Sequence, residues 1–526
     1  MREYNVILKK DVDYDEFWND IESDTDGGKL YIPNRRVEFT NERPASLRQC
    51  WYLLTDEEAE QLKLDDRIYD VEIPPEHRTD IVMMPKEVQN GDFTKTSSDV
   101  GAFLNWGLVR SNSTTNNYGT NLTASQSYTY ALAGTGVDVV IQDSGIEVFH
   151  PEFQDKNGTG RVVQLNWPSV SGLSFTQPAM HYVDYDGHGT HVAGIVAGKT
   201  YGWAKNSLIY SVKVSGLEGA GDNGGISTTY AFDCIKGWHN NKITGSFGQK
   251  RPTVVNMSWG YGTFYNSVTS VNYRGTSYTD SNTTTNASYR QTTYGLVNNS
   301  GAYAGYTYVA NARVSSVDVD VQEMIDAGII VCIAAGNRSF KVDISSGTDY
   351  NNNVVTDQGT IYYHRGSSPY DDEAIIVGSL DSTVYDANND RKASYSECGP
   401  GVTIYAPGTN IMSACSNTNA FSGENYYANT MYKQTNISGT SMASPQVAGI
   451  CALLMESNPK MTPAQLKASL LVNAGSAVYS VVSDNDWSVN TTLKGGSAKV
   501  AYNKFNSIEA SKISGLKMTG LNFRII

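Results

Sequence analysis

Three side chains of this sequence have the types and surroundings needed for acyl transfer through a nucleophilic serine. Ser441 lies in the stretch Gly-Thr-Ser-Met-Ala-Ser-Pro at 439–445, directly before an apolar helical run. A helix N-terminus supplies unpaired N–H groups and a partial positive charge, which would stabilise the oxyanion that a serine's attack creates. Asp143 follows a buried strand-like run, and His188 opens a second apolar helix. These groups could serve as nucleophile, base and the carboxylate that orients the base.

Each residue also has a plainer interpretation. Ser441 alone could be a helix N-cap, and Asp143 in Asp-Ser-Gly could form an Asx turn. His188 and His191, three residues apart, could bind a metal ion. We disfavour the metal because no Glu follows His188 as a zincin motif requires, and no third ligand is evident.

The three stretches together resemble a known family. Along the chain the three candidate residues occur in the order Asp, His, Ser. Asp143 lies in Val-Val-Ile-Gln-Asp-Ser-Gly at 139–145, and His188 lies in Asp-Gly-His-Gly-Thr-His-Val-Ala-Gly at 186–194. The third stretch is the one at 439–445 that contains Ser441. This set resembles the subtilisin-like serine proteases (subtilases), and Asn-Trp-Gly-Leu-Val-Arg at 105–110 resembles the proteinase K-like members. The resemblance implies a catalytic triad of Asp143, His188 and Ser441, with His191 in a structural role.

The resemblance also implies an oxyanion hole and a substrate cleft. Asn337, at the end of Ala-Ala-Gly-Asn, would donate its amide to the oxyanion together with the Ser441 N–H. Two backbone edges would pair with an extended substrate as added strands. The implied substrate-binding residues are Gly224, Gly225, Ser258, Trp259, Gly260, Ala335 and Gly336. Trp259 would favour an apolar or aromatic substrate side chain.

The elements that must position these residues predict an α/β fold. Apolar runs at 137–141 and 329–337 predict buried strands, the first of them parallel, and the run at 208–214 predicts another strand. The resemblance implies that these strands belong to a subtilisin-like parallel sheet with helices on both faces. Residues 1–75 pattern as β-α-β-β-α-β, with a capping box at Thr55, and predict a small ferredoxin-like α+β unit. Its position before a protease favours a propeptide that acts as chaperone and inhibitor.

The rest of the chain divides by composition. Residues 76–100 are polar and predict an exposed, cleavable linker, and residues 101–508 hold the catalytic domain. Residues 261–312 are dense in Tyr, Ser, Thr and Asn and predict a surface insertion with β-hairpin content. Residues 509–526 form a C-terminal tail.

Composition limits the partners. A net charge of −14 argues against a nucleic-acid binder, and no apolar run is long enough for a membrane span. The first residues lack the apolar segment of a secretory signal, so we expect a cytoplasmic or virion-associated protein rather than a secreted one. The six cysteines are widely spaced, form no metal motif and predict no disulfide framework; Cys332 and Cys451 lie in apolar runs and should be buried thiols.

The sequence therefore predicts a serine endopeptidase made as a self-processing precursor, with protein or peptide substrates and its own propeptide as inhibitor. Such chemistry needs no cofactor, although a structural Ca²⁺ would fit a chain rich in Asp and Asn. One alternative is a catalytically silent protein that keeps the fold for binding or a structural role. A remote alternative is a lipase or esterase, since 439–443 approaches G-x-S-x-G; that fold orders its triad Ser, Asp, His.

Overall fold

The computed structural model describes most of the chain up to Phe505. The residues outside it are 23–36, 38, 43–44, 79, 86–104, 117–129, 218–223, 246–249, 298, 304, 387, 480–485 and 506–526. The predicted tail at 509–526 and part of the predicted linker therefore lie outside the described residues.

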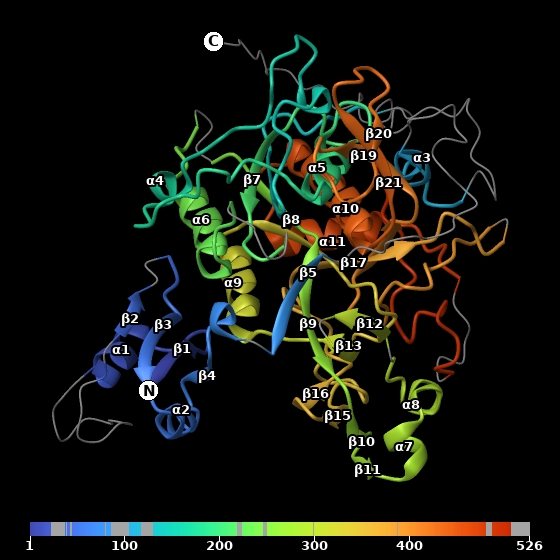
Figure 1. The fold of residues 1–526 in the computed structure, drawn as a ribbon. Coiled ribbons are helices and arrows are strands. Elements are labelled where there is room, and N and C mark those ends of the chain that lie inside the picture. Colours follow the sequence, from blue (N-terminus) through green and yellow to red (C-terminus); the bar gives the residue numbers. More distant parts are fainter. Residues whose placement is uncertain are drawn as a thin grey trace.

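A parallel sheet forms the centre of the molecule, in the strand order β18-β17-β14-β8-β6-β7 (Figure 1). Its strands are β6 (Asp138–Asp143), β7 (Leu208–Lys213), β8 (Thr253–Met257), β14 (Ile330–Ala334), β17 (Ile375–Leu380) and β18 (Ile404–Pro407). Nearly all their side chains are buried, as expected when helices cover both faces. The predicted parallel sheet is confirmed, and β8, β17 and β18 extend it beyond the three predicted strands.

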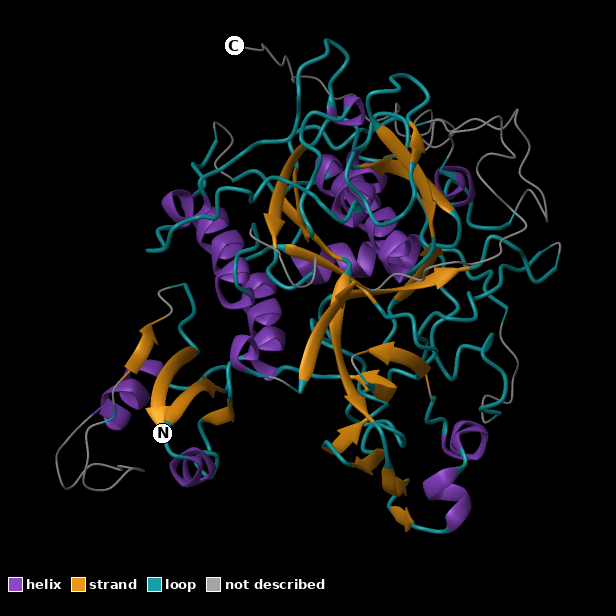
Figure 2. Cartoon of the chain, in the orientation of Figure 1, coloured by secondary structure: helices purple, strands orange, loops and turns teal. Residues whose placement is uncertain are grey.

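Helices cover the sheet in two groups. The helices of this part are α3 (Trp106–Arg110), α4 (Trp167–Ser171), α5 (His188–Ala197), α6 (Thr228–Asn241), α9 (Ser315–Asp326), α10 (Thr440–Ser457) and α11 (Pro463–Asn473), with 3₁₀ turns η1 (Pro75–His77) and η3 (Pro151–Phe153). Helices α5 and α10 pack on each other on one side of β7 and β8, and α6 and α9 pack on each other on the other side (Figures 1 and 2).

Three neighbouring strands of the sheet end at residues singled out from the sequence. Asp143 is the last residue of β6, Ser258 follows β8 directly, and Asn337 lies three residues beyond β14. Because β14, β8 and β6 are adjacent and parallel, their carboxyl ends lie along one edge, where open α/β sheets place functional groups.

The N-terminal unit has its own sheet and core. Its elements are β1 (Arg2–Leu8), α1 (Tyr14–Glu22), β2 (Phe39–Glu42), β3 (Gln49–Leu54), α2 (Asp56–Leu62) and β4 (Ile68–Glu72). The strands pair antiparallel in the order β2-β3-β1-β4 around a separate apolar cluster. The element order is the one read from the sequence, and Thr55 forms the expected capping box with Glu58. The ferredoxin-like assignment stays a prediction.

The segment predicted as an exposed linker contains a strand, which corrects that prediction. β5 (Ile81–Pro85) pairs antiparallel with β9 (Trp259–Tyr265), and Ile81 is buried. The short apolar run at 81–85 has no alternating pattern that would predict a strand. It pairs with a strand edge more than 170 residues away in sequence, and the local sequence does not indicate that partner. Figure 1 shows β5 lying along β9 below the central sheet.

The predicted insertion forms a compact lobe with its own buried cluster. Its elements are β9, β10 (Val268–Tyr273), β11 (Thr276–Tyr278), α7 (Ser281–Thr285), α8 (Ala287–Tyr294), β12 (Asn299–Tyr303), β13 (Tyr306–Asn311), β15 (Asn353–Thr356) and β16 (Gly359–Tyr362). They form the sheets β11-β10-β15-β16 and β12-β13-β9-β5. Tyr265, Tyr294, Phe340 and Tyr363 belong to one buried cluster, so residues 340–363 complete the lobe. The hairpin content is confirmed by β12 and β13, whereas the two helices were not predicted.

A third small sheet closes the catalytic part. It consists of β19 (Ile411–Cys415), β20 (Glu424–Asn425) and β21 (Lys433–Ile437), in the order β19-β21-β20. All six cysteines are buried, and the structure joins none of them in a disulfide. Among the described residues, no helix has both the length and the apolar character that a membrane span requires.

Candidate active site

Asp143 and His188 form a buried hydrogen-bonded pair. His188 Nδ1 lies 2.8 Å from Asp143 Oδ1, and the two side chains are 2% and 1% exposed. The same oxygen accepts the Ser144 N–H at 2.7 Å. With the carboxylate as acceptor, Nδ1 carries the proton, and Nε2 of a neutral imidazole is then the basic nitrogen.

Helix α5 brings His188 to this carboxylate through a close backbone approach. His188 is the first residue of α5, and Gly187 before it has φ 96°, a left-handed conformation that favours glycine. A Cβ on Gly189 would lie 2.2 Å from the Gly145 oxygen, so only glycine lets the helix approach the turn after β6. Substitution of Gly189 would therefore displace the histidine from its partner.

Asp184, which the sequence analysis did not identify, holds the start of α5. Its carboxylate accepts the backbone N–H groups of Gly187 and Thr190 at 2.8 and 2.9 Å, and the Ser144 hydroxyl at 2.9 Å. Burial raises the pKa of Asp184, while these hydrogen bonds act in the opposite direction. An acidic residue just before a helix start is the signal that could have identified it.

Ser441 is the second residue of α10, whose N-cap is Gly439, so it is not itself the N-cap. Its hydroxyl donates to the Ser258 carbonyl at 2.9 Å, and the Ser258 hydroxyl donates to the Ser441 carbonyl at 3.0 Å. Pro445 lies four residues further on and has no N–H, so it cannot pair with that carbonyl in the helix. The helical ladder thus leaves the Ser441 carbonyl available to Ser258.

The Ser258 hydroxyl is in turn positioned by Asn256 of β8. Asn256 Nδ2 donates to Ser258 Oγ at 2.9 Å, and Ser444 Oγ donates to Asn256 Oδ1 at 2.8 Å. This buried chain of polar groups joins the end of β8 to the first turns of α10. Helix α10 also packs on α5, so the helices that contain Ser441 and His188 are direct neighbours.

Asn337 presents a buried amide donor. Its Oδ1 accepts the Thr440 N–H at 2.8 Å and the Thr440 hydroxyl at 2.9 Å. Thr440 Oγ1 also accepts the Gly336 N–H at 3.0 Å. These bonds fix the side chain so that Nδ2 is the remaining group, and Nδ2 is buried with no hydrogen-bond partner among the described residues. Thr440 is a second residue that the sequence analysis did not single out.

The residues before Asn337 are held by close packing. Ala335 donates its N–H to the Val377 carbonyl at 2.9 Å. Gly336 has φ 125°, and a Cβ there would lie 2.4 Å from the Glu397 carboxylate. The two residues therefore set the direction in which the chain leaves β14 toward Asn337.

The two predicted substrate edges differ in what the structure describes. Trp259 and Gly260 begin β9, directly opposite Pro85 and Met84 of β5. The Trp259 indole is fully buried against Phe232, so its side chain belongs to the core here and only its backbone lies on the edge.

The second edge is described only at its end. Gly224 and Gly225 follow residues 218–223, which lie outside the described residues. The Gly224 carbonyl lies 3.1 Å from His181 Nδ1, and a Cβ on Gly224 would lie 2.5 Å from the Met180 oxygen. This contact fixes the position at which the glycine segment rejoins the fold.

His191 holds two strands together. Its Nε2 lies 3.0 Å from the carbonyls of Ile411 and Thr435, on β19 and β21. Burial lowers the pKa of His191 to about 3, so the ring is neutral and donates to both oxygens. This geometry agrees with the structural role implied by the resemblance. Within the described residues, no three His, Cys, Asp or Glu side chains gather as a metal site would require.

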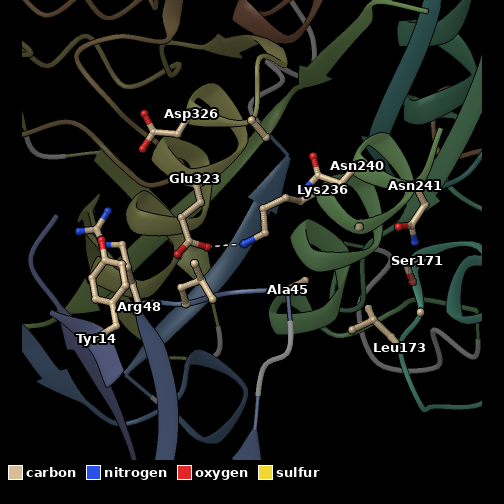
Figure 3. A pocket seen from close by; sticks show the side chains of 14 residues that line it. Tyr14, Ala45, Arg48, Ser171, Leu173, Lys236, Asn240, Asn241, Glu323 and Asp326 are labelled. Carbon is tan, nitrogen blue, oxygen red and sulfur yellow. Dashed lines mark hydrogen bonds and ion pairs between the residues drawn. The ribbon is translucent and has the colours of Figure 1, made fainter. Parts of the chain in front are cut away.

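A cavity of about 660 Å³ lies away from these residues, between the N-terminal unit and helices α6 and α9. Figure 3 shows Tyr14 and Arg48 on one side, Ser171 and Leu173 on the other, and the ion pair of Lys236 with Glu323 between them. Ser46 donates to Glu323 at 3.0 Å, and Arg48 donates to Gln322 at 2.6 Å. The cavity is thus part of a polar interface and contains no residue of the candidate active site.

The chain is similar to known proteins over most of its length. A family model described as the subtilase family matches residues 134–502. An extracellular serine proteinase of Thermus sp. (strain Rt41A) is 27% identical over 430 residues, which cover 82% of this chain and 72% of the relative. Alkaline protease 1 of Aspergillus clavatus is 30% identical over 381 residues, which cover 72% of this chain and 64% of the relative.

One solved structure extends the comparison to the fold. The crystal structure of fervidolysin from Fervidobacterium pennivorans, a keratinolytic enzyme related to subtilisin, has a TM-score of 0.52 and 18% identity. The likeness covers 95% of this chain and 60% of that chain, and it concerns the fold alone.

Proposed function

Because this chain belongs to the subtilase family and is a serine-type endopeptidase, we propose that Asp143, His188 and Ser441 are its catalytic residues. The observation that carries the assignment is the buried 2.8 Å hydrogen bond between Asp143 and His188. Its histidine begins the helix that packs on the helix of Ser441.

The proposed reaction is acyl transfer through a serine ester. His188 takes the proton of Ser441 as the hydroxyl oxygen attacks the peptide carbonyl, and Asp143 stabilises the charged imidazole and keeps its tautomer. The protonated His188 then gives its proton to the leaving amine, and an acyl-enzyme remains. Water, activated by the same histidine, releases the acid. No cofactor enters these steps, and structural Ca²⁺ remains a prediction.

We propose that Asn337 and the Ser441 N–H bind the oxyanion. The Nδ2 group of Asn337 is buried and oriented by two bonds from Thr440 to its other amide atom. The Ser441 N–H belongs to the first turn of α10, where backbone donors have no intrahelical partner. Donors fixed before the reaction stabilise the developing charge without reorganisation.

We further propose that the N-terminal unit is a propeptide that inhibits the enzyme until it is removed. This is supported by β5, which occupies the edge at Trp259 and Gly260 where a substrate would pair. Polypeptides in extended conformation, from loops or unfolded regions, are then the substrates, because strand pairing needs a free backbone.

A fluorophosphonate probe tests the triad and separates it from a catalytically silent protein. The purified, processed chain should form a covalent adduct at Ser441 and hydrolyse casein. Ser441→Ala should lose both, with a fall in kcat of about 10⁶, while its circular dichroism matches that of the wild type. Labelling and hydrolysis that persist in the variant would refute the assignment, and a wild type with neither property would support the silent alternative.

A further inference from the structure

Strand β9 continues well past the edge that was predicted to bind substrate. It pairs with β5 over five consecutive residues, from Trp259 opposite Pro85 to Thr263 opposite Ile81. Thr263 Oγ1 adds a bond of 3.2 Å to the Asp80 carbonyl, one residue before β5. β5 therefore pairs with residues of β9 beyond Gly260, and Figure 1 shows the two strands side by side.

The backbone of β9 shows which residues face the β5 edge. The Tyr261 N–H donates to the Ser368 carbonyl, and its carbonyl accepts the Ala312 N–H, both at 3.1 Å and both away from β5. Because neighbouring residues of a strand direct their N–H and C=O groups to opposite edges, Gly260 and Gly262 direct theirs toward β5. Gly262 lies directly opposite Val82, as Gly260 lies opposite Met84.

The position of Ser441 shows which substrate residue lies opposite each residue of β9. Its hydroxyl lies 2.9 Å from the Ser258 carbonyl, so the attacked carbonyl belongs to the substrate residue opposite Ser258. An antiparallel substrate counted back from that residue places its third residue opposite Gly260 and its fifth opposite Gly262.

The lobe keeps this part of β9 in place. On the edge away from β5, β13 pairs with β9 from Gly262 to Tyr265. Tyr265 is fully buried in the cluster that includes Tyr294 and Tyr363. The edge that faces β5 is therefore supported from the opposite side and does not depend on β5 for its position.

We propose that Gly262 is a further substrate-binding residue, which exchanges two backbone hydrogen bonds with the fifth residue before the cut bond. The enzyme then selects extended polypeptides with at least five residues on that side, whatever their side chains at the fifth position. This inference rests on the proposed function. It assigns to the lobe the role of lengthening the substrate-binding strand.

A series of peptides of different length tests how many substrate residues before the cut bond the enzyme binds. N-acetylated peptides with one fixed sequence around the cut and three, four, five or six residues before it are assayed with the purified, processed chain. The acetyl carbonyl of the four-residue peptide already occupies the position of the fifth carbonyl, so the fifth residue adds one bond, from its N–H to the Gly262 carbonyl. We expect kcat/KM to rise about 5-fold between four and five residues, and to change less than 2-fold between five and six. A curve that is flat beyond four residues would refute the proposal.

N-methylation tests the backbone contact itself. In the six-residue peptide, methylation of the fifth amide removes a donor that faces Gly262, whereas methylation of the sixth removes one that faces away. We expect at least a 5-fold loss of kcat/KM in the first case and less than a 2-fold loss in the second. Equal losses would contradict the register.

A pair of variants locates the effect on the strand. Gly262→Pro removes the strand N–H, which is one of the two bonds, and should lower the gain from the three-residue to the six-residue peptide about 5-fold, whereas Gly262→Ala retains the N–H and should keep the gain. The ratio of kcat/KM for the six-residue and three-residue peptides is the measurement. A chain that cleaves none of the peptides would refute the proposed function, whereas cleavage at equal ratios in both variants would refute only the role of Gly262.

Discussion

At the scale of single residues, Thr440 and Pro445 determine which hydrogen bonds the groups around the nucleophile make. Thr440 uses its N–H and hydroxyl to hold one end of the Asn337 amide, which leaves the other end as a donor. Pro445 deprives the Ser441 carbonyl of its helical partner, and Ser258 replaces it. Both residues act through others and are positioning residues.

The Asn337 donor can be tested with two substitutions. Asn337→Ala removes the whole amide, and Asn337→Asp keeps an acceptor for Thr440 but carries no N–H. Since the Ser441 N–H remains in both, we expect kcat to fall by about 10²–10³ with little change in KM, the loss that one such donor causes in subtilisin. Steady-state kinetics on a peptide substrate provide the measurement, and a kcat in Asn337→Asp close to that of the wild type would show that Nδ2 does not bind the oxyanion.

At the scale of elements, the N-terminal unit caps two helices of the catalytic part. Helix α9 has no side-chain cap of its own, and Glu72 accepts the Ser316 N–H at 2.8 Å. Helix α6 also lacks one, and Glu76 accepts the Thr229 N–H at 2.9 Å. Each side-chain oxygen accepts a backbone N–H that its helix leaves without an intrahelical partner, so Glu72 and Glu76 join the two parts of the chain.

Removal of these caps should weaken the inhibitory unit. Glu72→Ala and Glu76→Ala should each raise the dissociation constant of the cleaved N-terminal unit about 5-fold, because one cap contributes about 1 kcal/mol. Residual inhibition after self-cleavage, followed against dilution, is the measurement. Glu57→Ala, an exposed carboxylate of α2, is the matched control and should leave the constant unchanged. Equal behaviour of all three variants would mean that the caps do not hold the unit.

At the scale of the whole molecule, β5 sets where the chain should cut itself. Because Ile81–Pro85 lie along β9, next to the residue that Ser441 contacts, we expect the cut after Pro85 and before Gly101. An intramolecular attack avoids the entropy of bringing two molecules together, so processing should be fast. Intact-mass analysis should show the shortened wild type and a full-length Ser441→Ala. A full-length wild type that still hydrolyses peptides would make the N-terminal unit a permanent domain.

The molecule should also lose stability in acid. Burial lowers the pKa of several histidines to about 3 or 4, namely His150, His191, His239 and His364. Between pH 6.5 and 4 the unfolded chain binds protons at these rings and the folded chain does not, so stability falls as pH falls, by up to about 1.4 kcal/mol per pH unit for each ring.

Two partly buried carboxyls act in the opposite direction in the same range. Burial raises the pKa of Glu72 to about 7 and that of Asp371 to about 6, so each stabilises the fold as pH falls. The histidines are more numerous, and the net effect is a loss. Thermal unfolding of full-length Ser441→Ala, which cannot digest itself, should show a lower midpoint at pH 5 than at pH 7. A midpoint that is equal or higher at pH 5 would contradict these assignments.

The sequence by itself determined the local parts of this site. Apolar runs with motif residues at their ends predict β6 with Asp143 at its end and helices that begin near His188 and Ser441. Thr55 forms the capping box that its spacing predicts. Such features depend on hydrophobic period and hydrogen bonds within a few residues, so a short stretch contains the information for them.

Only the tertiary structure decided which distant segments become partners. β5 has no pattern that names β9 as its neighbour, and the lobe needs Phe340 and Tyr363, far from the insertion, to close its core. Glu72 caps a helix 244 residues away. The sequence shows that a strand edge or a carboxylate can form hydrogen bonds, but it does not show with which partner. The packing of the whole chain determines what it bonds to, and here that packing seats β5 beside Ser258 and extends the substrate edge to Gly262.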